Sequence, residues 1–127
     1  MKLTVILLTL TTAFSTAALA DISVHVLDTN KGLPGRNIEV SLYENVDNNW
    51  KLIDKKITDD NGRIKDFNFG ESLNYRVVFD VKKFFSSQNT DTFYEEIPVD
   101  FKITSKDEHY HIPLLLSPYA YSTYRGN

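Results

Sequence analysis

Two of the three histidines stand where acid–base chemistry is possible, because each lies on the polar side of a strand-like pattern. His25 alternates with Val24 and Val26, and His111 alternates with the apolar residues on either side of it, so both imidazoles are expected to point away from an apolar core. A neutral imidazole, with an unperturbed pKa of about 6.5, can take a proton from water near neutral pH. Ordinary exposed strand histidines are the alternative interpretation.

The last seven residues, 121–127, form a second chemistry-bearing feature. They read Tyr-Ser-Thr-Tyr-Arg-Gly-Asn and follow an apolar run at 112–116 almost directly. A terminal segment without a role would fray, whereas this one offers hydroxyl, guanidinium and amide groups. The composition predicts that something polar is held at the C-terminus.

Other kinds of reactive site are disfavoured. His109 shares the polar face of His111, which makes a transition-metal site conceivable, but no Asp, Glu or Cys stands at a spacing that would complete a ligand set. The carboxylates, including Asp59, Asp60 and the pair at 95–96, fall in turns or beside lysines and are interpreted as solvated. The chain has no cysteine, no glycine-rich phosphate loop and no Gly-x-Ser-x-Gly elbow, which disfavours a covalent mechanism.

The elements that must position these residues follow a period of two. Turn signals separate the apolar alternations, most clearly in the breaker-rich segment 28–37 and in the Asp-Asp-Asn-Gly turn at 59–62. The segment 81–87 differs because its apolar residues are spaced at i, i+3 and i+4, which predicts one short helix. We predict an all-β, antiparallel sandwich of seven to eight strands. The strands are expected at 22–27, 38–42, 50–58, from Arg63 onward, 75–79, 94–103, 109–116 and 119–124.

The N-terminal residues 1–20 have the pattern of a signal peptide. Lys2 precedes an apolar stretch at 3–14, and Ala18-Leu19-Ala20 offers a small-x-small cleavage site. The stretch is shorter than the roughly 20 residues of a membrane span, so an uncleaved anchor is the minor alternative. We expect a mature domain at 21–127 that is exported to the periplasm, with secretion as the alternative.

Composition limits the partners. One domain of this size has a modest core, and without cysteine it has no disulfide to stabilise it, so self-association is plausible. The formal net charge is −3 and the charges are interspersed. Neither nucleic acid nor anionic lipid is an expected partner, and after signal cleavage no membrane contact is expected.

Four blocks, in order along the chain, carry a resemblance to a known family. They are Ser-Val-His-Val-Leu-Asp at 23–28 with Gly32 and Pro34, Thr-Asp-Asp-Asn-Gly-Arg at 58–63, His-Tyr-His-Ile-Pro-Leu-Leu-Leu-Ser at 109–117, and residues 121–126. Together they resemble the transthyretin-related 5-hydroxyisourate hydrolases. The first block is weakly specific, whereas the last two are highly specific and the Tyr-Arg-Gly sequence is the family's hallmark. The chain differs at its end, where Asn127 replaces the usual serine.

The resemblance implies a fold, an activity and an assembly. The fold would be a transthyretin-like (prealbumin-like) sandwich. The activity would be hydrolytic opening of the lactam ring of 5-hydroxyisourate, a planar product of urate oxidation, to 2-oxo-4-hydroxy-4-carboxy-5-ureidoimidazoline, with neither metal nor cofactor. The assembly would be a homotetramer, a dimer of dimers, with active sites in the clefts where dimers meet.

The resemblance also implies the site. The residues implied as catalytic are His25, Arg63 and His111, and those implied to bind substrate are His25, Arg63, Tyr124, Arg125, Gly126 and Asn127. One histidine would deprotonate water while the other donates to the ring or positions that water, and the sequence does not say which. Arg63 would clamp the carbonyls through its planar guanidinium, and Tyr124 would hydrogen-bond the substrate.

Three alternatives remain at this level. The first is a transthyretin-like carrier of a small aromatic ligand without catalysis, although carriers lack the histidines and the Tyr-Arg-Gly tail. The second is a structural surface module of the same sandwich type. The third is a weakened enzyme, because Asn127 removes a hydroxyl near the site while it still offers a donor and an acceptor.

Overall fold

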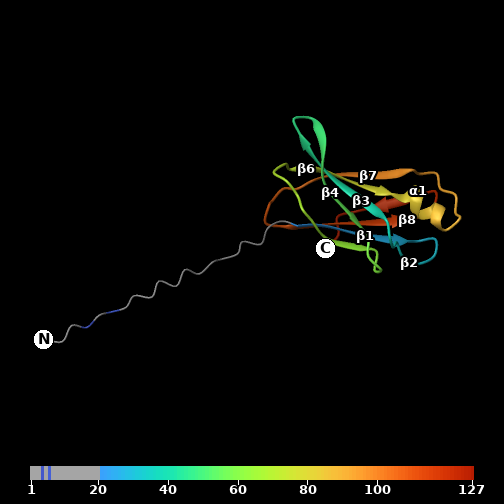
Figure 1. Ribbon diagram of the computed structural model, residues 1–127, viewed down its shortest axis with the longest axis horizontal. Helices are drawn as coiled ribbons and strands as arrows, with labels where there is room; N and C mark the ends of the chain where they lie inside the picture. Colours follow the sequence, from blue (N-terminus) through green and yellow to red (C-terminus); the bar gives the residue numbers. More distant parts are fainter. Residues whose placement is uncertain (1–3, 5, 7–20) are drawn as a thin grey trace.

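The computed structural model describes Thr4, Ile6 and residues 21–127. Residues 21–127 contain two β-sheets and one short helix (Figure 1). The predicted signal peptide and its cleavage site therefore lie outside the described residues, apart from those two positions. The described elements are β1 (Asp21–Asp28), β2 (Leu33–Pro34), β3 (Glu39–Val46), β4 (Asn49–Ile57), β5 (Arg63–Phe67), β6 (Asn74–Asp80), α1 (Val81–Ser87), β7 (Glu96–Lys102), β8 (His109–Leu116) and β9 (Tyr121–Thr123).

The two sheets differ in how they are built. One follows the order β4-β3-β6-β7, and all of its pairs are antiparallel. The other follows the order β2-β1-β8-β9, with β5 also paired to β1. The predicted antiparallel sandwich is confirmed with one correction, which is that β1 and β8 are parallel. Parallel neighbours need a long connection, and here all four strands of the β4-β3-β6-β7 sheet lie between β1 and β8 along the chain.

The core confirms the predicted alternation. Ile22, Val24 and Val26 of β1 are fully buried between the sheets, together with Leu114 and Leu116 of β8. Burial of each such side chain contributes about 1.5–3 kcal/mol to folding. The intervening residues of β1 and β8 must therefore face outward, which places the histidines on the outer face of this sheet.

Local signals are confirmed in several places. The helix α1 spans the predicted residues, with Val81, Phe84 and Phe85 buried and the Asp80 side chain accepting a hydrogen bond from the Lys83 N–H at 3.4 Å. Pro98 lies on β7, an edge strand of its sheet, where a residue without a backbone N–H is tolerated. The two-residue β2 lies inside the segment that was predicted to be only a turn, and β9 is shorter than predicted.

Within the described part of the chain, no helix has both the length and the apolarity to cross a bilayer.

Candidate active site

Three neighbouring strands bring the predicted catalytic residues together on the outer face of one sheet. His25 of β1 is paired with Arg63 of β5 on one side, and Ser23 of β1 is paired with His111 of β8 on the other. The imidazole rings of His25 and His111 have centroids 6.4 Å apart and an interplanar angle of 30°. Residues that are distant in sequence thus form one polar cluster.

The turn before β5 positions Arg63. Asp59 Oδ1 accepts hydrogen bonds from the backbone N–H groups of Asn61 and Arg63, each at 2.9 Å. These bonds, above all the one from Arg63, lower the pKa of Asp59. Gly62 has φ of 73°, and its carbonyl accepts a 2.8 Å hydrogen bond from Val26 N–H. The interpretation of Asp59 as a turn former is confirmed.

The C-terminal segment is held along β8. Thr123 Oγ1 donates to the Pro113 carbonyl at 2.7 Å, and Gly126 N–H donates to the His111 carbonyl at 2.8 Å. A Cβ atom at Gly126 would lie 2.5 Å from His111 Cδ2 and 3.0 Å from Pro113 Cγ. The tail is therefore ordered as predicted, and only glycine lets the backbone pass this close to the imidazole.

Two surface hollows meet at His111. The first has a volume of about 320 Å³, and its lining includes Arg63, His109, His111 and Asn127. The second has a volume of about 250 Å³, shares only His111 with the first, and is lined by Tyr124 and Arg125.

Within one chain, the predicted substrate-binding residues do not share one hollow: Arg63 and Asn127 line the first, Tyr124 and Arg125 line the second, and His25 and Gly126 line neither. Arg125 directs its guanidinium over the Tyr110 ring, 4.7 Å from the centroid, and donates to Glu108 at 3.1 Å. Tyr124 is exposed, whereas Asn127 lines the first hollow. The structure therefore brings Arg63, His111 and Asn127 together at the first hollow, with His25 beside Arg63 and His111 but not in the lining. It leaves Tyr124 and Arg125 at the second hollow.

Burial and positive charge favour neutral imidazoles in the cluster. Burial lowers the pKa of His25, and the nearby Arg63 guanidinium lowers it further. Burial also lowers the pKa of His111, with smaller contributions from Arg63, His109 and His25. A neutral imidazole retains a lone pair, so either ring can accept a proton from water near neutral pH.

Comparison with known proteins assigns the chain to a family. Residues 22–126 match the model of the HIUase/Transthyretin family. The chain belongs to this family. A Salmonella dublin 5-hydroxyisourate hydrolase is 46% identical over 109 residues, which cover 84% of this chain and 80% of that protein.

Solved members of the HIUase/Transthyretin family share the fold. The Klebsiella pneumoniae 5-hydroxyisourate hydrolase superposes with a TM-score of 0.74 at 26% identity, covering 85% of this chain and 94% of that one. Sea bream transthyretin in complex with thyroxine superposes with a TM-score of 0.78 at 30% identity, covering 84% and 94%. The predicted transthyretin-like fold is confirmed, and the backbone alone does not separate hydrolase from carrier.

Two polar residues of this cluster, Ser23 and Asp21, were not predicted from the sequence, whereas His109 was expected on the same face as His111. Ser23 Oγ lies 2.7 Å from His111 Nδ1 and 3.1 Å from His109 Nε2, and His109 Nδ1 contacts the Asp21 carboxylate. Sequence spacing indicates no acidic residue near His109, but the parallel pairing of β1 with β8 brings Asp21 to it. The described residues contain no group of three or more His, Cys, Asp or Glu side chains arranged to hold a metal ion.

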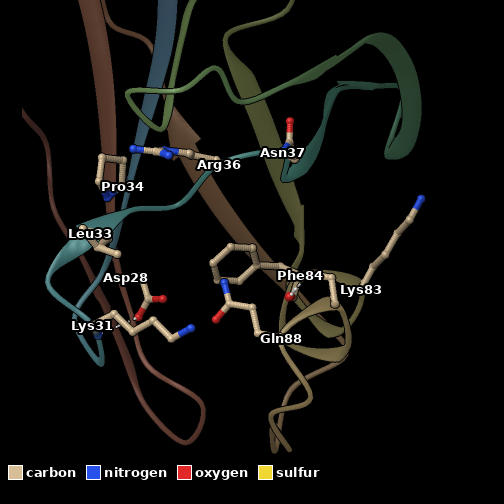
Figure 2. Close-up of a pocket in the computed structure, with 10 residues that line it drawn as sticks. Asp28, Lys31, Leu33, Pro34, Arg36, Asn37, Lys83, Phe84 and Gln88 are labelled. Atoms are coloured by element: carbon tan, nitrogen blue, oxygen red, sulfur yellow. Dashed lines mark hydrogen bonds between the residues drawn. The ribbon is translucent and has the colours of Figure 1, made fainter.

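Another hollow of about 440 Å³ lies between β2 and α1 and contains none of the predicted site residues (Figure 2). Lys31 and Gln88 point into this space, whereas Lys83 points away from it. The Asp28 carboxylate at its edge accepts hydrogen bonds from the backbone N–H groups of Asn30 and Lys31, at 3.0 and 3.2 Å. This carboxylate therefore stabilises the turn after β1.

Proposed function

We propose that this chain hydrolyses 5-hydroxyisourate by opening its lactam ring, a step in the degradation of urate. The observation that carries the proposal is the outer-face cluster of His25, His111 and Arg63, in which both imidazoles favour the neutral form beside a permanent cation. The relatives named 5-hydroxyisourate hydrolase support the same substrate.

The cluster provides what ring opening requires. One imidazole takes a proton from water, and the resulting hydroxide adds to the lactam carbonyl carbon. The Arg63 guanidinium donates to the carbonyl oxygens and stabilises the oxyanion. As the ring C–N bond breaks, the protonated imidazole returns its proton to the leaving nitrogen, so that atoms and charge balance over the reaction. Asn127, at the edge of the hollow, orients the ring through its amide.

The assembly that suits this site is a homotetramer made of two dimers. The first hollow opens on the surface of one chain, and the exposed ring of Tyr124 lies on the C-terminal segment two residues before Gly126, which pairs with His111. A second chain placed over the outer face would bury this ring, exclude water from the hollow and bring a Tyr124 toward it. This arrangement also gives Tyr124 and Arg125 a route to the substrate that one chain does not offer.

Export precedes catalysis in this proposal. The signal peptide at 1–20 directs the chain to the periplasm and is cleaved before Asp21. Expression of the full chain in a Gram-negative host, followed by fractionation and mass spectrometry, tests this directly. A periplasmic product beginning at Asp21 is expected, and a cytoplasmic product that retains residue 1 or 2 would contradict it.

A carrier function is the second candidate, because sea bream transthyretin, solved with thyroxine, shares this fold at a TM-score of 0.78. The two candidates are separated by turnover. Urate and a urate oxidase generate 5-hydroxyisourate, and its decay is followed in the ultraviolet with and without the protein. Acceleration over the spontaneous decay is expected, and ligand binding without acceleration would favour the carrier.

A further inference from the structure

The outer face of the β1–β8 pair carries a line of four polar side chains that contact one another end to end. His111 Nδ1 lies 2.7 Å from Ser23 Oγ, which lies 3.1 Å from His109 Nε2. His109 Nδ1 in turn contacts Asp21 Oδ1. The parallel register places Asp21 beside His109 and Ser23 beside His111, and the Ser23 side chain is buried.

If His109 is neutral, counting protons along this line fixes which atom donates at each contact. An ionised carboxylate only accepts, so the proton between Asp21 and His109 belongs to His109 Nδ1. A neutral His109 then has no proton on Nε2 and accepts the hydroxyl proton of Ser23. Because a serine has a single hydroxyl proton, its oxygen must accept from His111, which therefore carries its proton on Nδ1. His111 Nε2 is left with a free lone pair.

That lone pair is accessible. Among the described residues His111 Nε2 has no hydrogen-bond partner, and in the same part of the chain no buried side-chain nitrogen or oxygen lacks one. The nitrogen is therefore exposed to solvent, on a ring that lines the first hollow with Arg63.

We propose that Asp21, His109 and Ser23 form a positioning chain that holds His111 in the Nδ1–H tautomer and so makes its Nε2 atom the base. The role of His111 Nε2 as a base rests on the proposed hydrolysis of 5-hydroxyisourate. The proton of water passes to Nε2, while Nδ1–H continues to donate to Ser23, so no other bond in the chain changes. Only His111 touches the reacting water.

The charges around the chain suit this arrangement. Besides burial, Arg63 on β5, His109 on β8 and His25 on β1 oppose a resting positive charge on His111. At the other end, the Asp21 carboxylate holds the Nδ1 proton of His109. Arg125 donates weakly to the His109 carbonyl at 3.5 Å, but its charge is paired with Glu108. Positive charge is thus placed beside the accepting nitrogen of His111, and negative charge lies at Asp21, the other end of the hydrogen-bonded line.

The test is Ser23→Ala, which removes both hydrogen bonds of the hydroxyl. Long-range 1H–15N NMR of the resting protein should show His111 protonated on Nδ1 in the wild type and a mixture with the Nε2–H form in the variant. The kcat for 5-hydroxyisourate should fall about 10- to 100-fold, by analogy with loss of the hydrogen-bond partner that orients a metal-bound histidine, while KM changes little. Ser23→Thr retains a hydroxyl and should restore both the tautomer and most of kcat.

Ser41→Ala is the matched control, since Ser41 is also a buried strand serine but lies on β3 in the opposite sheet. It should leave the His111 tautomer and kcat unchanged. The proposal is overturned if wild-type His111 rests in the Nε2–H form, or if Ser23→Ala lowers kcat without changing the tautomer. The NMR measurement needs no substrate, so absence of 5-hydroxyisourate turnover in the wild type would count against the proposed function and leave the test of the hydrogen-bonded chain intact.

Discussion

At the scale of single residues, the guanidinium of Arg63 lies close enough to both imidazoles to lower the pKa of His25 and of His111, in each case after the larger effect of burial. In the proposed mechanism, one side chain would therefore both bind the substrate carbonyls and keep the candidate bases neutral. Asp59 and Gly62 hold Arg63 in place through the backbone, and neither is assigned a contact with substrate.

Arg63→Gln should raise the pKa of both histidines, because it removes a positive charge that opposes their protonation. The acid limb of the kcat/KM profile should shift to higher pH, as should the NMR titrations of the two rings. Lys65→Gln, also on β5 at the same hollow, is the control and should shift neither ring by a comparable amount. Unchanged titrations in Arg63→Gln would show that the guanidinium does not act on these rings.

Gly126→Ala should impair catalysis through His111. The new Cβ would lie 2.5 Å from His111 Cδ2, so either the ring or the tail must move. A displacement of about 1 Å in a reactive group can cost on the order of 100-fold in rate. We expect a large loss of kcat in the ultraviolet assay and altered His111 chemical shifts. Ser122→Ala, in the exposed part of the same tail, should be near neutral, and full activity of Gly126→Ala would contradict the packing argument.

At the scale of elements, local patterns predicted most of what holds the site, because strand alternation, the α1 spacing and the Asp-Asp-Asn-Gly turn depend on neighbours in sequence. The outward orientation of His25 and His111 followed from the same alternation. The pairing of β1 with β8 was not predictable, because all strands of the β4-β3-β6-β7 sheet lie between them in the sequence. The contacts of Ser23 with His109 and His111 depend on that pairing, and they were missed for the same reason.

The turn before β5 provides a stability test with an internal control. Gly62 and Gly32 both have positive φ, at 73° and 67°, but a Cβ at Gly62 would lie 2.5 Å from the Val26 carbonyl oxygen while one at Gly32 has nothing within 4 Å. Gly32→Ala should cost about 1 kcal/mol of unfolding free energy for the backbone conformation alone.

Gly62→Ala should cost more than Gly32→Ala, by roughly 1–3 kcal/mol, because it adds a collision with the β1 backbone. Urea unfolding at pH 7 measures both variants. Gly62→Ala should also weaken activity, since Arg63 follows this turn directly. Equal costs for the two variants would contradict the close approach of Gly62 to β1.

At the scale of the whole molecule, the lowered histidine pKa values link stability to pH. Below the unfolded pKa of about 6.5, the unfolded chain binds protons that folded His25 and His111 resist, so the free energy of unfolding should fall as pH decreases from 7 toward 5. Asp59 and Asp100 have lowered pKa values, and their stabilisation is lost only below about pH 4.

Urea unfolding at several pH values between 5 and 7 measures this dependence. His111→Gln should flatten it, because one of the two resisting groups is gone. A free energy of unfolding that rises as the pH falls through this range would contradict neutral histidines in the folded protein.

Assembly belongs to this scale as well, because the proposed cleft needs a second copy. Activity per chain should fall when dilution separates the proposed tetramer, with the midpoint matching dissociation measured by analytical ultracentrifugation. Unchanged activity per chain in a demonstrated monomer would place the whole site within one chain.

The central claim is that His25, Arg63 and His111 form the catalytic centre of a 5-hydroxyisourate hydrolase. The most direct measurement is the rate of 5-hydroxyisourate decay with the wild type and with His25→Ala, Arg63→Ala and His111→Ala, each shown to be folded by circular dichroism. We predict that the wild type accelerates the decay and that each substitution removes most of the acceleration, by at least about 100-fold. Three folded variants with wild-type rates would contradict the claim.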